Sequence, residues 1–128
     1  MTVSKLAQKL RIVPGRRALV LNAPEGYDDV LRPLPAGAVL CTRGKGPFAF
    51  AHVFAKDVAE LERLAPRALD ALEYDGVFWM SYPKGTSALK SDLNRDRGWN
   101  VLQARGLRPV SQISIDETWS ALRFRPTQ

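Results

Sequence analysis

The run FAFAHVFA, residues 48–55, constrains the fold more than any other part of this 128-residue sequence. Apolar side chains occupy both of its alternating faces, whereas a strand with one solvated face alternates apolar and polar residues. A strand of this kind must be covered on both sides, as in the central parallel strands of α/β proteins. We therefore expect a sheet with helices packed against each face.

Other segments extend this plan. Short apolar runs predict further buried strands over residues 18–21, 38–42 and 76–83. The closing stretch LRPVSQISIDETWSALRFRP contains two β-rich runs about the turn IDET, which predicts an antiparallel hairpin. Together these segments favour a three-layer, mostly parallel α/β sheet with right-handed crossovers and a C-terminal antiparallel hairpin. No linker-like segment interrupts the order, so we expect one domain over residues 1–128, with a core from about 17 to 126.

Helices are expected between and before these strands. Ser4 can cap a short amphipathic helix over residues 4–11. Asp57, with Glu60 three residues later, can cap a longer helix in which Pro66 causes either a kink or the start of a second helix. A further helix is expected to start at Ser91 or Asp92 and to stop near residue 106.

Composition limits the classes of function. Nineteen Lys and Arg against thirteen Asp and Glu give a net charge of +6, which allows attraction to anionic partners, although solvated surface charge is the simpler interpretation. The sequence has no apolar run long enough to cross a bilayer and no secretory signal, so we expect a cytoplasmic protein without a membrane association. With Cys41 as the one cysteine and His52 as the one histidine, we expect neither an internal disulfide nor a metal site.

His52 and the last strand each allow two interpretations. His52 lies within the apolar run, so a neutral core histidine with one hydrogen-bonded partner is favoured over a catalytic base. In the last strand, alternation places Trp119, Arg123 and Arg125 on one face. The arginines are expected in solvent, but exposed aromatic rings interleaved with arginine can also stack single-stranded bases.

The C-terminal half carries a resemblance. YDGVFWMSYPKG, then a helix, then GLRPVSQISIDETWSALRF is similar to small bacterial proteins classed as a domain of unknown function, with landmarks at Tyr82-Pro83-Lys84, Gly106-Leu107 and Trp119. The order of elements over residues 17–126 resembles a reduced Rossmann-like domain of the S-adenosylmethionine-dependent methyltransferase type. The resemblance implies a cofactor loop rich in glycine after the first strand, and an acidic residue at the end of the second strand.

The sequence departs from that pattern at both places. The loop after the first strand is NAPEG, residues 22–26, which has one glycine and a proline that lacks a backbone donor. Thr42 and Arg43 stand where the acidic residue is expected. Ordinary binding of S-adenosylmethionine is therefore disfavoured.

A candidate ligand site still follows from the topology, because open parallel sheets bind ligands beyond the carboxyl ends of their strands. A mixed polar set is predicted to gather there: Asn22, Glu25, Thr42, Arg43, Lys56, Ser81 and Lys84. Three basic side chains in this set would suit a small anionic metabolite or a nucleotide.

Three functions remain open from the sequence. The first is a non-catalytic or degenerate Rossmann-like domain with a binding or regulatory role. The second is a divergent S-adenosylmethionine-dependent methyltransferase that holds its cofactor through Asn22, Glu25 and backbone amides. The third is a basic module that binds nucleic acid through phosphate contacts.

Overall fold

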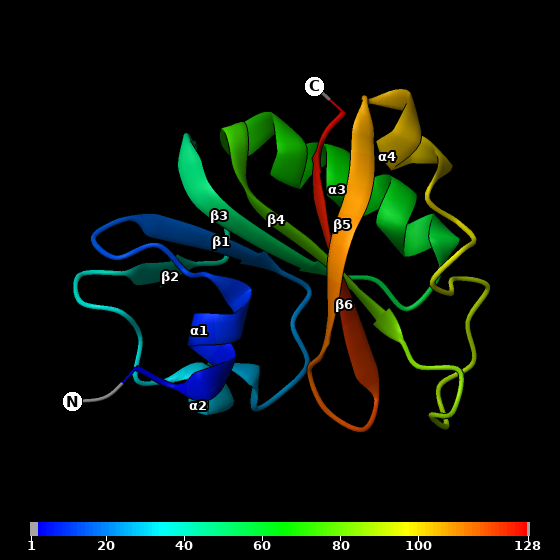
Figure 1. Ribbon diagram of the computed structural model, residues 1–128, viewed down its shortest axis with the longest axis horizontal. Coiled ribbons are helices and arrows are strands. Elements are labelled where there is room, and N and C mark those ends of the chain that lie inside the picture. The colour runs from blue at the N-terminus through cyan, green and yellow to red at the C-terminus, as the bar shows by residue number, and fades with distance from the viewer. Residues whose placement is uncertain (1–2, 128) are drawn as a thin grey trace.

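The computed structural model describes residues 3–127, which form a six-stranded sheet of order β2-β1-β3-β4-β6-β5 (Figure 1). The neighbouring pairs β2–β1, β1–β3 and β3–β4 are parallel, whereas β4–β6 and β6–β5 are antiparallel. The strand bounds are β1 Arg17–Leu21, β2 Val39–Cys41, β3 Phe48–Phe54, β4 Leu72–Pro83, β5 Leu107–Ser114 and β6 Trp119–Pro126. The mixed α/β sheet and its closing antiparallel hairpin confirm the predicted fold class.

Helices cover both faces of the sheet. On one face, α1 (Lys5–Leu10) and α2 (Tyr27–Leu31) pack in a cluster with the rings of Phe50, Phe54 and Trp79. On the other face, α3 (Val58–Ala71) and α4 (Asn100–Ala104) pack in a second cluster. Figure 1 shows α1 and α2 lying together, apart from α3 and α4. All seven residues of β3 are buried, as its doubly apolar sequence predicts.

Two helix starts are formed by the predicted caps. The Ser4 hydroxyl accepts a hydrogen bond from the Ala7 amide at 3.0 Å, and the Asp57 carboxylate accepts one from the Glu60 amide at 2.9 Å. Each satisfies a donor that has no partner within its own helix. Of the alternatives left open at Pro66, the start of a second helix is wrong, because α3 is one helix with Pro66 inside it.

The predicted helix over residues 91–106 is wrong for most of its length, because α4 begins at Asn100. The preceding polar side chains bond to backbone amides instead: Ser91 accepts from the Leu93 amide at 2.9 Å, and Asn94 accepts from the Asp96 amide at 2.9 Å. Such local bonds compete with helix formation. Gly98, at φ +104°, adopts a conformation outside the helical region.

The fourth strand starts earlier than predicted, at Leu72 instead of residue 76. It ends at Pro83, as predicted, and Ser81 and Tyr82 lie within its buried end and not in a loop beyond it. The β2–β3 connection, residues 42–47, has no helix and crosses β1 close to its start, where the Arg17 guanidinium donates to the Lys45 carbonyl oxygen at 2.7 Å.

Candidate functional site

The strand order places a topological switch point between β1 and β3. From β1 the chain continues to β2 on one side, while β3 and β4 extend the sheet on the other side. In open α/β sheets, ligands bind beyond the carboxyl ends of the strands at this point. Here that crevice lies between the loop after β1, residues 22–26, and the segment after β3, residues 55–57.

Asn22 spans this crevice. Its side-chain Nδ2 donates to the Phe54 carbonyl oxygen at 2.9 Å and to Glu60 Oε1 at 3.2 Å. Its backbone is left-handed, at φ 62°, a conformation that asparagine tolerates better than most residues. Asn22 therefore ties the end of β1 to the end of β3 and to the first turn of α3.

Three carboxylates, Asp57, Glu60 and Asp92, bind the amides at the start of α3, and we refer to them as the carboxylate cluster. Glu60 accepts from the Lys56 amide at 2.8 Å, and Asp92 accepts from the Val58 amide at 2.8 Å. Asp57 accepts from the Glu60 amide, as described above. A helix start commonly binds an anionic ligand through such amides. In this protein the chain's own carboxylates hold two of these amides, those of Val58 and Glu60, together with the Lys56 amide just before the helix.

The loop after β1 is folded onto itself. The Tyr27 amide donates to the Pro24 carbonyl oxygen at 3.2 Å, and Gly26 takes a positive φ of 88° directly before α2. The helix that follows has five residues, and its N-cap residue, Gly26, has no side chain that could cap it. The loop thus provides one glycine at its last position, where it turns the chain into α2.

Below α2, Tyr27, His52 and Ser81 form a buried hydrogen-bonded set. Tyr27 Oη lies 2.6 Å from His52 Nδ1, and Ser81 Oγ lies 2.6 Å from His52 Nε2. A neutral imidazole donates from one nitrogen and accepts at the other, so both contacts are satisfied in either tautomer. Burial lowers the pKa of His52 to about 3 and raises the pKa of Tyr27. His52 is the expected neutral core residue, but with two side-chain partners and not one.

The predicted site residues do not gather at one place. Asn22 and the Lys56 backbone meet through Glu60. Ser81 is fully buried against His52, and Lys84 Nζ donates to Ser114 Oγ at 2.7 Å on β5.

Glu25 and Thr42 line separate hollows. Glu25 lines a hollow of about 340 Å³ with Leu6 and Ile115, whereas Thr42 lines one of about 380 Å³ with Cys41. Pro24 and Gly26 border both hollows. Arg43 is exposed in the β2–β3 connection.

Glu60 and Asp92 belong to the crevice but were not predicted there. The sequence indicated both as helix-capping residues, which is a local signal. Their contacts with Asn22 and the Val58 amide span 38 and 34 residues, and no spacing pattern foretells them. Trp119 lies nearby with its ring centroid 5.2 Å from that of Phe54, so it covers the end of β3 on the α2 face.

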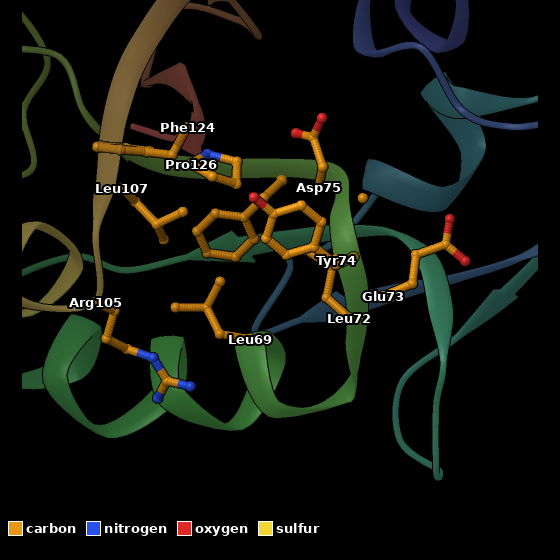
Figure 2. A pocket seen from close by; sticks show the side chains of 11 residues that line it. Leu69, Leu72, Glu73, Tyr74, Asp75, Arg105, Leu107, Phe124 and Pro126 are labelled. Carbon is orange, nitrogen blue, oxygen red and sulfur yellow. The ribbon is translucent and has the colours of Figure 1, made fainter. Parts of the chain in front are cut away.

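A further hollow of about 360 Å³ lies at the opposite end of the sheet, where β4 begins (Figure 2). Its lining is largely apolar and includes Leu69, Leu107 and Pro126. Figure 2 shows the carboxylates of Glu73 and Asp75 pointing away from this apolar centre, and the Arg105 guanidinium at its lower edge. Each is bound by a charged partner elsewhere, in the pairs Arg16–Glu73, Arg125–Asp75 and Arg105–Asp70. The hollow therefore presents apolar surface without a free charge from these three side chains.

No group of three or more His, Cys, Asp or Glu in residues 3–127 could hold a metal ion. No helix within the same residues is long and apolar enough to span a membrane.

The strand order, the switch point and the antiparallel β4–β6–β5 end define a Rossmann-like, methyltransferase-like α/β fold. Comparison with solved structures agrees. A SAM-dependent methyltransferase from Aquifex aeolicus aligns with a TM-score of 0.60 and 8% identity, covering 94% of this chain and 87% of its own. The N-methyltransferase NodS from Bradyrhizobium japonicum aligns with a TM-score of 0.56 and 13% identity, covering 95% and 94%. No protein-family model and no curated protein sequence matches this chain.

Proposed function

We propose that this protein is a non-catalytic binding or regulatory domain built on a methyltransferase-like frame. The observation that carries the proposal is the Asn22 side chain, which bridges the switch point to the Phe54 carbonyl oxygen and to Glu60. The place where the fold would receive a cofactor is closed by the chain's own hydrogen bonds. The domain therefore keeps the architecture of the enzymes it resembles without their binding loop.

The residues present do not fit S-adenosylmethionine. A cofactor loop needs glycines because the backbone must approach the ligand closely, yet Ala23 and Pro24 put side chains in the loop and Pro24 removes an amide. The acidic residue that the resemblance implies after the second strand is replaced by Thr42 and Arg43. The amides at the start of α3 are held by the carboxylate cluster.

The carboxylate cluster also argues against a small anionic metabolite in the crevice. An anion placed there would meet Glu60 and Asp92 at close range, and like charges repel one another. Lys56 offers a compensating charge on an exposed side chain. We therefore place any anionic partner of this domain elsewhere on its surface.

A divergent methyltransferase is the alternative, and the similarity of the fold to solved methyltransferases favours it. In that case Asn22 would have to release the Phe54 carbonyl oxygen and Glu60 in order to contact the cofactor. The released Phe54 carbonyl oxygen would then need a new partner, and leaving it buried without one costs about 1–3 kcal/mol, whereas Glu60 keeps its contact with the Lys56 amide. Asn22 and Glu25 would bind the ligand directly.

Isothermal titration calorimetry with S-adenosylmethionine, and separately with S-adenosylhomocysteine, distinguishes the two functions. The non-catalytic domain gives no stoichiometric binding tighter than about 1 mM. Tight one-to-one binding that Asn22→Ala and Glu25→Ala weaken, while the exposed control Glu62→Ala leaves it unchanged, would establish the methyltransferase-type site and overturn the proposal.

A further inference from the structure

Arginine side chains share one face of the C-terminal hairpin. Arg108 of β5 lies directly opposite Arg125 of β6, and Arg123 precedes Arg125 by two residues, so the three side chains leave the sheet on the same side. Arg123 also pairs with Trp79 of β4, which packs in the cluster beneath α1 and α2. The three arginines are therefore on the α1 side of the sheet.

The end of α1 brings a fourth arginine to this place. The Trp79 indole Nε1 donates to the Leu10 carbonyl oxygen at 2.8 Å, so the last turn of α1 lies over Trp79. Arg11 follows directly, as an exposed residue at φ 62° that ends the helix. Since Arg123 is the β6 neighbour of Trp79, Arg11 and Arg123 approach one another from the helix and from the sheet. We refer to Arg11, Arg108, Arg123 and Arg125 as the arginine cluster.

Charge within the arginine cluster is only partly neutralised. Asp75 binds Arg125 through two contacts, Oδ1 with Nε at 3.0 Å and Oδ2 with the terminal nitrogen at 2.6 Å. Arg123 differs, because its Nε is buried and has no hydrogen-bond partner among residues 3–127. Burial, and then the charges of Arg11 and Arg125, lower the pKa of Arg123. Asp75 also attracts Arg123, but four arginines held close around one acid still repel one another, and an anion between them would relieve that repulsion.

We propose that the arginine cluster binds a phosphate group between Arg11 and Arg123, with the Arg125–Asp75 pair and Arg108 at its border. The guanidinium fork matches phosphate oxygens in pairs, and a phosphate has enough oxygens to accept from two arginines at once. Arg125 is held in place by Asp75 before any ligand arrives, which reduces the ordering that binding requires. The site is independent of the crevice between β1 and β3, so it stands whether or not that crevice binds a cofactor.

The bound phosphate group can belong to a small phosphate compound or to the backbone of a nucleic acid. Titrations of the full chain distinguish these two kinds of ligand. The probes are inorganic phosphate, adenosine monophosphate and a single-stranded oligothymidylate, each followed at low salt by amide chemical shifts of β5 and β6. Saturation by inorganic phosphate or the monophosphate identifies a small phosphate ligand. Saturation by the oligonucleotide alone, with affinity that falls as salt rises, identifies the nucleic-acid backbone.

Matched variants test the residues. Arg11→Gln removes an exposed charge from the cluster and is expected to weaken the observed binding about tenfold, the effect of one lost charge-assisted contact. Arg63→Gln removes an exposed arginine from α3, on the other face of the sheet, and is expected to leave affinity unchanged. Failure of all three probes to bind, or equal loss in the two variants, would overturn the site. Loss in Arg11→Gln alone supports it.

Discussion

The buried His52 makes the stability of this protein depend on pH. Its pKa is 6.5 in an unfolded chain and about 3 in the folded protein, because burial disfavours the charged ring. Between these values the unfolded chain binds a proton that the folded protein does not, so the contribution is complete above pH 6.5 and is lost as pH falls toward 3. Each pH unit in this window is worth about 1.4 kcal/mol, so a fall from 6.5 to about 5 should cost about 2 kcal/mol.

Urea unfolding followed by tryptophan fluorescence at a series of pH values measures this loss directly. His52 is the one histidine of the sequence, so its imidazole Hε1 resonance can be followed in the folded protein without ambiguity. We expect that resonance to show no protonation above about pH 4. The variant His52→Gln, which cannot titrate, should lose the part of the pH slope that lies between pH 5 and about 6.5, whatever its stability at neutral pH. A folded-state midpoint near 6.5, or an unchanged slope in the variant, would refute the reasoning.

Two further predictions concern the packing at the two ends of α3. A Cβ on Gly46 would lie 1.9 Å from the Ala71 carbonyl oxygen, so Gly46→Ala should lower the free energy of unfolding by roughly 3 kcal/mol. The control is Gly85→Ala, whose added Cβ meets nothing within 4 Å, and it should leave the urea midpoint nearly unchanged. Equal midpoints for the two variants would contradict that close contact. Asp92→Ala removes the acceptor of the Val58 amide, so it should lower the free energy of unfolding by about 1 kcal/mol and speed hydrogen exchange at that amide. An unchanged exchange rate would show that the contact does not form in solution.

The parts of the fold that the sequence predicted well carry their signal locally. The run over residues 48–55 is apolar on both faces, which predicts a central strand covered on both sides, and β3 is that strand. Likewise, Asp57 with Glu60 specifies a helix start, and α3 begins there. Two β-rich runs about a polar turn specify a hairpin, which β5 and β6 form.

Predictions failed where local and long-range bonds compete. Ser91 and Asp92 have the composition of a helix start, but Asp92 binds the Val58 amide of another helix and Ser91 bonds to the Leu93 amide. Asp92 and the Val58 amide that it caps are 34 residues apart in the sequence, so the local sequence pattern cannot predict this contact.

The candidate site was less predictable than the fold. The strand order determines which strand ends meet at the switch point, so topology indicates where a crevice is expected. It could not indicate which polar side chains turn toward that crevice. Asn22 bonds across it, whereas Ser81, one position earlier in β4 than Tyr82, points into the core at His52. The predicted end of this strand, residue 83, is the observed one, and the alternation of side chains along β4 turns Ser81 to the face of the sheet that His52 occupies.

The proposed function depends most directly on the closure of the crevice between β1 and β3 by the chain's own bonds. A 15N–1H spectrum of the full chain, recorded with and without about 1 mM S-adenosylmethionine, tests it at the residues concerned. We predict that the Asn22 side-chain amide and the backbone amides of residues 22–26 and 55–57 do not move, and that the Asn22 amide protons stay protected from exchange by the Phe54 carbonyl oxygen. Saturable shifts at these amides, with loss of that protection, would contradict the claim and establish a cofactor site.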